Sequence, residues 1–134
     1  MTMAKRTIVD PLTGQHLTFL ETAADTEGRS LRAEVSLDPG GFVPRHLHLR
    51  QDEQLEVHEG SVRFRTHGVD RVLGPGDSAR VTRRHLHAVA NAGPGEARFE
   101  LEIRPARHIE QLMRSIFAVG RAFRPLARLR RRRS

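Results

Sequence analysis

Short segments in which apolar and polar residues alternate, separated by glycine and proline turns, fill the first three quarters of the chain. In segments 61–66 and 97–104 every second side chain is apolar, as in a strand with one buried face. Turns are indicated by DPGG at 38, GPGD at 74 and NAGPGE at 91, and no helical pattern precedes residue 105. This pattern predicts an all-β sandwich or jelly-roll barrel, with strands expected at 15–20, 31–37, 41–49, 54–59, 61–66, 69–73, 78–82, 85–91 and 97–104.

After Pro105 the apolar spacing becomes helical. Apolar residues and one glycine recur every three or four positions until Pro125, at Ile109, Leu112, Met113, Ile116, Phe117, Gly120 and Phe123. We expect one amphipathic helix here, with its apolar stripe packed on the barrel or on a partner subunit rather than on a membrane. The predicted organisation is a β-barrel over 1–104, a helix over 105–124 and a disordered basic tail over 125–134.

The composition restricts the class of protein and of site. A length of 134 residues suits one domain with one hydrophobic core. The chain has no cysteine, which excludes disulfides and leaves histidine and carboxylate as the metal ligands available. Neither a signal peptide nor an apolar run long enough to span a membrane is evident, so a cytoplasmic location is expected.

Charge is distributed unevenly along the chain. Residues 1–103 carry a net charge of −2, whereas residues 104–134 carry ten arginines against Glu110 alone. A basic tail can bind nucleic acid or an anionic membrane. No nucleic-acid recognition motif accompanies it, so we interpret the run as a solvated terminus and keep docking as an alternative. The arginines concerned are Arg121, Arg124, Arg128, Arg130, Arg131, Arg132 and Arg133.

The stretch PRHLHLRQDEQLEVHEG at 44–60 contains candidate metal ligands. Residues two apart in an extended chain point to the same side, so His46 and His48 project together. Glu53 can return a carboxylate to the same interior, and nitrogen with oxygen ligands suits a divalent first-row metal. A second stretch, GPGDSARVTRRHLHAVANAG, supplies His87 and Asn91. The alternative is that these histidines are ordinary polar surface residues.

Together the two stretches resemble the motifs of the cupin superfamily, over a core of residues 40–91. The second motif departs from the family pattern at Thr82, where proline is usual, and at Arg84, where glycine is usual. Neither departure replaces a ligand. The first motif, G-x5-H-x-H-x3,4-E-x6-G, is matched in full by Gly40, His46, His48, Glu53 and Gly60, and the second, G-x5-P-x-G-x2-H-x3-N, by Gly76, His87 and Asn91.

The resemblance implies the cupin double-stranded β-helix and a divalent transition metal, one of Fe, Mn, Ni, Cu or Zn. Its ligands would be His46, His48, Glu53 and His87, with one or two positions left for water, oxygen or substrate. These ligands must be deprotonated, so acid below about pH 6 should remove the metal. His85 and Asn91 are candidates for groups that support the ligands or contact substrate.

The chemistry of the remaining residues is less specific, and no catalytic residue beyond the ligands is identified. We expect His16, His58, His67 and His108 to be surface residues, together with Asp52, Glu56 and Glu59. The absence of Trp and Tyr disfavours a carbohydrate isomerase. The leading hypothesis is a dioxygenase acting on a small organic molecule, with a non-catalytic sensor or carrier and a cupin isomerase as alternatives. A homodimer is expected.

Overall fold

The structure is a computed structural model that describes residues 6–123, within which ten strands and two helices are formed. The strands and helices are β1 (Thr7–Asp10), β2 (Gln15–Glu21), α1 (Ala23–Thr26), β3 (Leu31–Leu37), β4 (Phe42–His46), β5 (Asp52–Glu59), β6 (Val62–Thr66), β7 (Val69–Leu73), β8 (Ser78–Val81), β9 (His87–Asn91), β10 (Ala97–Arg104) and α2 (Ile109–Ala122).

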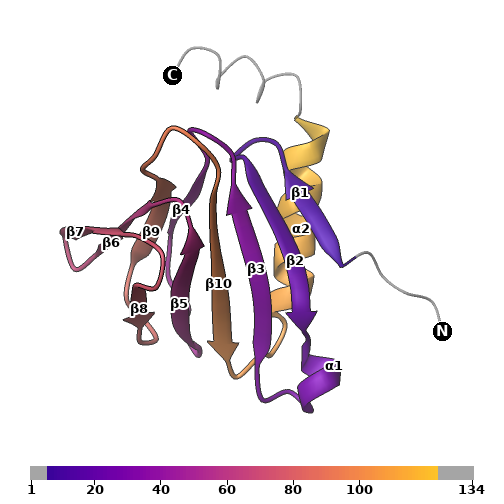
Figure 1. Ribbon diagram of the computed structural model, residues 1–134. Coiled ribbons are helices and arrows are strands. Elements are labelled where there is room, and N and C mark those ends of the chain that lie inside the picture. The colour runs from indigo at the N-terminus through magenta and orange to yellow at the C-terminus, as the bar shows by residue number, and fades with distance from the viewer. Residues whose placement is uncertain (1–5, 124–134) are drawn as a thin grey trace.

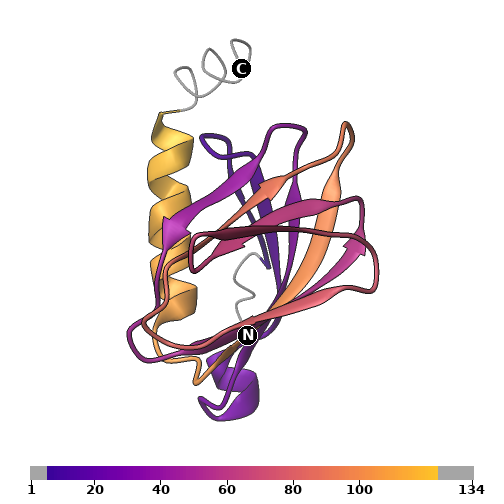
Figure 2. The same ribbon diagram turned by 90° about the vertical axis from the view of Figure 1, so that its left-hand side faces the viewer.

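Two antiparallel sheets form the body of the molecule (Figure 1). One has the order β1-β2-β3-β10-β5-β8, and the other has the order β4-β9-β6-β7. The sheets face each other, and α2 stands along one side of the barrel that they form (Figure 2). This arrangement confirms the all-β jelly-roll prediction and the single helix near the C-terminus.

Period-two alternation directs one face of each long strand into the space between the sheets. Along β3 the side chains of Leu31, Ala33, Val35 and Leu37 are buried, while the residues between them are partly exposed. β10 pairs antiparallel with both β3 and β5, so its buried side chains continue the same core. The residues predicted to fill the barrel, Val62, Phe64, Val89 and Phe99, are all buried.

Several predicted elements differ from those observed. β1 was not predicted because four residues are too few to show a period, and its strand is completed by pairing with β2. The expectation of no helix before residue 105 is wrong, because α1 forms one helical turn there. At its start, Asp25 Oδ2 accepts the backbone N–H of Thr22 at 2.9 Å. The long predicted strand 41–49 ends at His46, and the strand predicted from 85 begins at His87.

Helix α2 begins at Ile109, four residues later than predicted, and packs against β1. Ile109, Phe117 and Gly120 are buried there, and the Arg114 guanidinium lies 4.7 Å from the centre of the Phe19 ring. The predicted stripe is only partly covered, because Leu112, Ile116 and Phe123 are each about half exposed, as is Val119. The helix is therefore apolar on two sides, and only one of them contacts the barrel.

Part of the predicted basic tail can be placed. Arg121 lies in α2, and its Nη1 donates a hydrogen bond to the Val9 carbonyl at 3.1 Å. The other predicted tail arginines, Arg124, Arg128 and Arg130 to Arg133, lie outside the described residues. No helix in the described part of the chain is long and apolar enough to span a membrane.

Candidate metal centre

Four side chains from three strands and one loop converge between the two sheets. His46 ends β4 and lies opposite His87, the first residue of β9, in the four-stranded sheet. His48 follows β4 by two residues, and Glu53 comes from β5 in the facing sheet. One nitrogen or oxygen atom from each residue can be chosen so that all lie within 4.8 Å of one another. The structure thus brings together the four residues that the sequence nominated as ligands.

Backbone carbonyls orient two of the imidazole rings. Nδ1 of His46 lies 2.8 Å from the Pro44 carbonyl oxygen, and Nδ1 of His87 lies 3.1 Å from that of His85. A carbonyl oxygen only accepts hydrogen bonds, so in both rings Nδ1 must carry the hydrogen. The neutral form of each ring then presents the lone pair of Nε2, the arrangement found in most histidine-metal sites.

The remaining contacts leave two buried nitrogens unsatisfied. Nε2 of His48 and Nε2 of His87 are buried, and neither has an aligned hydrogen-bond partner among the described residues. Glu53 Oε2 lies 2.6 Å from the His87 nitrogen and 3.9 Å from the His48 nitrogen. Buried polar atoms without partners are rare in folded proteins and require an explanation. Three nitrogens and a carboxylate oxygen around one point fit a divalent first-row metal ion.

The ionisation of the four groups agrees with this fit. Burial lowers the pKa of His46 and the pKa of His48, which favours their neutral, ligating forms. Burial alone would raise the pKa of Glu53, but the adjacent His87 ring outweighs it and holds that pKa below its ordinary value. Burial also opposes protonation of His87, but Glu53 outweighs it and raises the pKa of His87. A proton and a metal cation therefore compete for Nε2 of His87.

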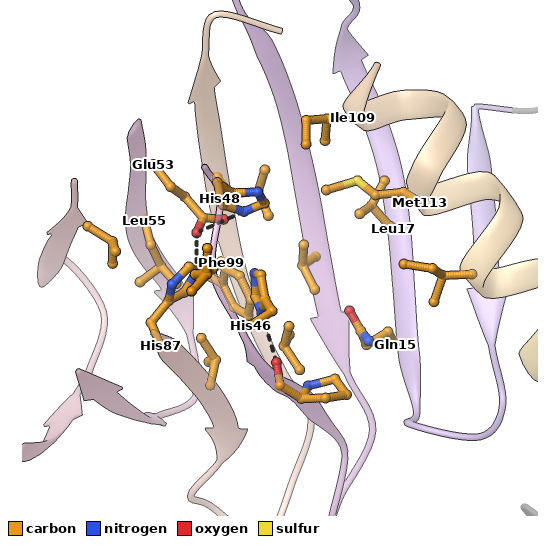
Figure 3. Close-up of a pocket in the computed structure, with 18 of the residues that line it drawn as sticks. Gln15, Leu17, His46, His48, Glu53, Leu55, His87, Phe99, Ile109 and Met113 are labelled. Carbon is orange, nitrogen blue, oxygen red and sulfur yellow. Dashed lines mark hydrogen bonds and ion pairs between the residues drawn. The ribbon is translucent and has the colours of Figure 1, made fainter. Parts of the chain in front are cut away.

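A cavity of about 240 Å³ opens from the cluster into the barrel. Figure 3 shows the histidines and Glu53 on one side of this space, with Leu17, Met113 and Ile109 on the other. Helix α2 forms part of the wall, and its half-exposed residues Leu112 and Ile116 also line the cavity. Apart from the four clustered residues, Gln15 is the one polar residue among the described residues that line it.

A family model for the cupin domain matches residues 33–104, which is more than half of the chain and includes all four clustered residues. This chain belongs to the cupin family. No curated protein matches the sequence significantly.

Solved structures of cupins share the fold. KdgF from Halomonas sp. is 22% identical with a TM-score of 0.61, over 70% of this chain and 81% of that one. A predicted oxalate decarboxylase from Thermotoga maritima is 21% identical with a TM-score of 0.67, over 78% and 99%. A recombinant oxalate oxidase in complex with glycolate is 25% identical with a TM-score of 0.63, over 71% and 53%.

The two predicted supporting residues of this cupin lie elsewhere than expected. The His85 ring interacts with Thr82 Oγ1 at 2.9 Å and packs on the His67 ring at a centroid distance of 4.6 Å. What reaches the cluster from His85 is its backbone carbonyl, because β9 begins two residues later than predicted. The Asn91 amide donates to the carbonyls of Leu37, Asp38 and Gly95, so within the described residues it braces a turn.

The predicted surface residues of the motif region lie at the surface, and one of them, Asp52, also binds Arg83. Glu56, His58 and Glu59 are exposed. Asp52 is partly exposed and accepts hydrogen bonds from the backbone N–H of Arg83 at 2.9 Å and from its Nε at 3.2 Å. These bonds lower the pKa of Asp52 and tie the loop before β9 to the start of β5.

The sequence analysis missed Gln15 and the contribution of α2 to the cavity wall. Gln15 shares the inward face of β2 with Leu17 and Phe19, and all three are buried. A glutamine in phase with two core residues was therefore a visible signal that its amide points into the interior. The position of α2 had no such signal, because its apolar residues face two sides.

Proposed function

We propose that His46, His48, Glu53 and His87 bind a divalent first-row metal and that this cupin is a metal-dependent enzyme acting on a small organic molecule. The observation that supports this most strongly is the buried His48 Nε2, which makes no hydrogen bond among the described residues, beside the close pair of His87 and ionised Glu53 at the edge of an apolar cavity. A purely structural cluster would satisfy the His48 nitrogen with a hydrogen bond from the protein. Open coordination positions facing a cavity are typical of catalytic sites.

The reaction we favour is dioxygenation, in which both atoms of O₂ enter the substrate and no external reductant is consumed. A bound redox-active ion such as iron or manganese would supply the electron transfer that oxygen chemistry requires. The protein itself contributes three neutral imidazole donors and the negative charge of Glu53. That carboxylate offsets part of the charge of the ion. The apolar walls, including Leu17, Phe99 and Phe117, exclude water from the reacting groups.

Two alternatives make different predictions from the same geometry. A non-catalytic cupin that carries or senses a small molecule would have the same metal site without turnover. An isomerase acting on a sugar is less well supported, because the cavity wall offers one amide and otherwise apolar side chains to a polyhydroxylated substrate. Among the described lining residues none is Lys or Arg, so the phosphate of a sugar phosphate would find no cationic side chain in addition to the proposed metal.

Metal content of untagged protein tests the proposal first. Elemental mass spectrometry on wild type should find a near-stoichiometric transition metal, and His48→Ala and Glu53→Ala should abolish it. His58→Ala is the matched control, because His58 is exposed on β5 and should leave the metal content unchanged. Absence of metal after reconstitution with each candidate ion would overturn the enzymatic proposal. Oxygen uptake with panels of small aromatic and aliphatic acids then separates a dioxygenase from a binding protein.

For assembly, we propose a homodimer in which α2 of one copy covers α2 of the other. Leu112, Ile116, Val119 and Phe123 are spaced as one helical stripe, and each is about half exposed. A two-fold axis across this stripe buries the same apolar residues of both copies. The alternative partners, nucleic acid and an anionic membrane, depend on seven arginines, of which only Arg121 lies within the described residues.

A further inference from the structure

The cavity has a second polar group, remote from the metal cluster. Gln15 is only 6% exposed, and its Nε2 donates a hydrogen bond to Thr13 Oγ1 at 2.9 Å. This is the one side-chain hydrogen bond of Gln15 within the described residues, and it fixes the amide so that its oxygen faces the cavity (Figure 3). The neighbouring wall consists of apolar side chains such as Leu17 and Met113. A buried acceptor aimed into an apolar cavity calls for a donor from the ligand.

The sheet order sets the scale of the separation between the two polar regions. Gln15 is on β2 and Glu53 is on β5, which are three strand positions apart in the order β2-β3-β10-β5. Gln15 is level with Ala97 of β10, whereas Glu53 is level with Ile103, six residues further along that strand. At about 4.8 Å per strand and 3.3 Å per residue, the two backbones lie roughly 25 Å apart in a flat sheet. Both side chains line the same cavity and shorten this span, so an elongated ligand reaches from one to the other.

The charge of the wall restricts the ligand further. No Lys or Arg is found among the described residues that line the cavity, and the Gln15 oxygen is an acceptor. A second anionic group at the Gln15 end would be buried opposite an acceptor without a cation, which is strongly unfavourable. A hydroxyl or an uncharged N–H donates to Gln15 without that cost.

We propose that Gln15 determines specificity, and that the substrate has one metal-binding end, an apolar body and an uncharged hydrogen-bond donor at its far end. This inference rests on the proposed function, because the metal holds the first end. It excludes substrates that would place a carboxylate or a phosphate beside Gln15, such as dicarboxylates long enough to span the cavity.

Three series of probes test the donor requirement on the full-length, zinc-loaded protein, since zinc binds ligands without redox turnover. They are the unbranched carboxylates of four to twelve carbons, their ω-hydroxy derivatives and the corresponding dicarboxylates, with affinities measured by isothermal titration calorimetry. At the best-fitting length, wild type should bind the ω-hydroxy acid roughly tenfold more tightly than the simple acid. Dicarboxylates should bind most weakly.

The variant Gln15→Leu should remove this preference, so that the simple acid binds at least as tightly as the ω-hydroxy acid. Gln15→Met is a second variant of similar volume, and circular dichroism with bound zinc measured for each shows that fold and metal site are intact. Gln111→Leu makes the leucine change at an exposed position of α2 and should leave the wild-type preference unchanged. An equal preference in wild type and in the folded, zinc-loaded Gln15 variants would overturn the inference.

Failure of the metal proposal is recognised separately. If wild type binds no metal, the proposed function fails, and the Gln15 site is then tested in metal-free protein with 1-alkanols and the matching 1-chloroalkanes, which lack the donor. Wild type should bind the alkanols more tightly and shift the Gln15 side-chain amide signals in nitrogen-15 NMR spectra. A preference unaffected by Gln15→Leu in this second assay would overturn the inference by itself.

Discussion

Replacing Gly120 with alanine is expected to destabilise the protein, although the same change inside an isolated helix stabilises it by about 1 kcal/mol. Gly120 is buried in α2 where the helix meets β1. A Cβ atom added there would overlap Asp10 Oδ1 and lie 2.6 Å from Asp10 Cγ. Asp10 is itself 2% exposed and accepts a hydrogen bond from the Leu12 backbone N–H at 3.0 Å, so it has little freedom to move.

The magnitude follows from what must give way. Moving the carboxylate of Asp10 sacrifices a hydrogen bond to a charged group, worth roughly 1.5–3 kcal/mol. Overpacking at the helix–barrel contact adds roughly 1–3 kcal/mol of strain. After the gain in helix propensity of about 1 kcal/mol, the free energy of unfolding should fall by roughly 1.5–5 kcal/mol. Because α2 also lines the cavity, the contact between Gly120 and Asp10 is relevant to the site as well as to stability.

Urea unfolding of the metal-free protein, followed by circular dichroism, measures the change from the shift in midpoint. Ser115→Ala, at an exposed position of the same helix, is the control for propensity and should be neutral or slightly stabilising. In an Asp10→Ala background the overlap is absent, so Gly120→Ala should no longer cost stability. A stabilising Gly120→Ala in the wild-type background, or an equal cost in both backgrounds, would refute the reasoning.

Three further predictions concern the metal and the assembly. Metal at a hundred times its dissociation constant should raise the free energy of unfolding by about 2.7 kcal/mol in wild type and leave His48→Ala unchanged, as calorimetry with and without chelator can show. Metal occupancy should fall as the pH drops, because protons compete for the imidazoles. The raised pKa of His87 makes this competition begin at higher pH than for an ordinary histidine. Retention of metal after dialysis at pH 5 would contradict this prediction. Val119→Glu, at a half-exposed position outside the cavity wall, should convert the dimer to monomer in light scattering with the fold retained. A wild-type monomer would contradict the proposed assembly.

The strand pattern was predictable because burial on one face of a sheet imposes a period of two on the sequence. Leu31, Ala33, Val35 and Leu37 could be assigned to a buried face from the sequence, and they are buried. The same local rule placed His46 and His48 together before Glu53. Strand ends were less predictable: β9 begins at His87, after a loop in which Arg83 bonds to Asp52, a residue distant in the sequence.

The sequence by itself determined the residue types of the candidate site and the all-β class, because spacing along an extended chain and turn chemistry are local. Only the tertiary structure decided which groups meet. Pairing of β4 with β9 brings His46 opposite His87, and packing of the two sheets brings Glu53 to them. The same packing leaves Gln15 in the cavity and places α2 along its wall. These are contacts between residues far apart in the chain, and their geometry depends on sheet order and helix docking, which no local pattern encodes.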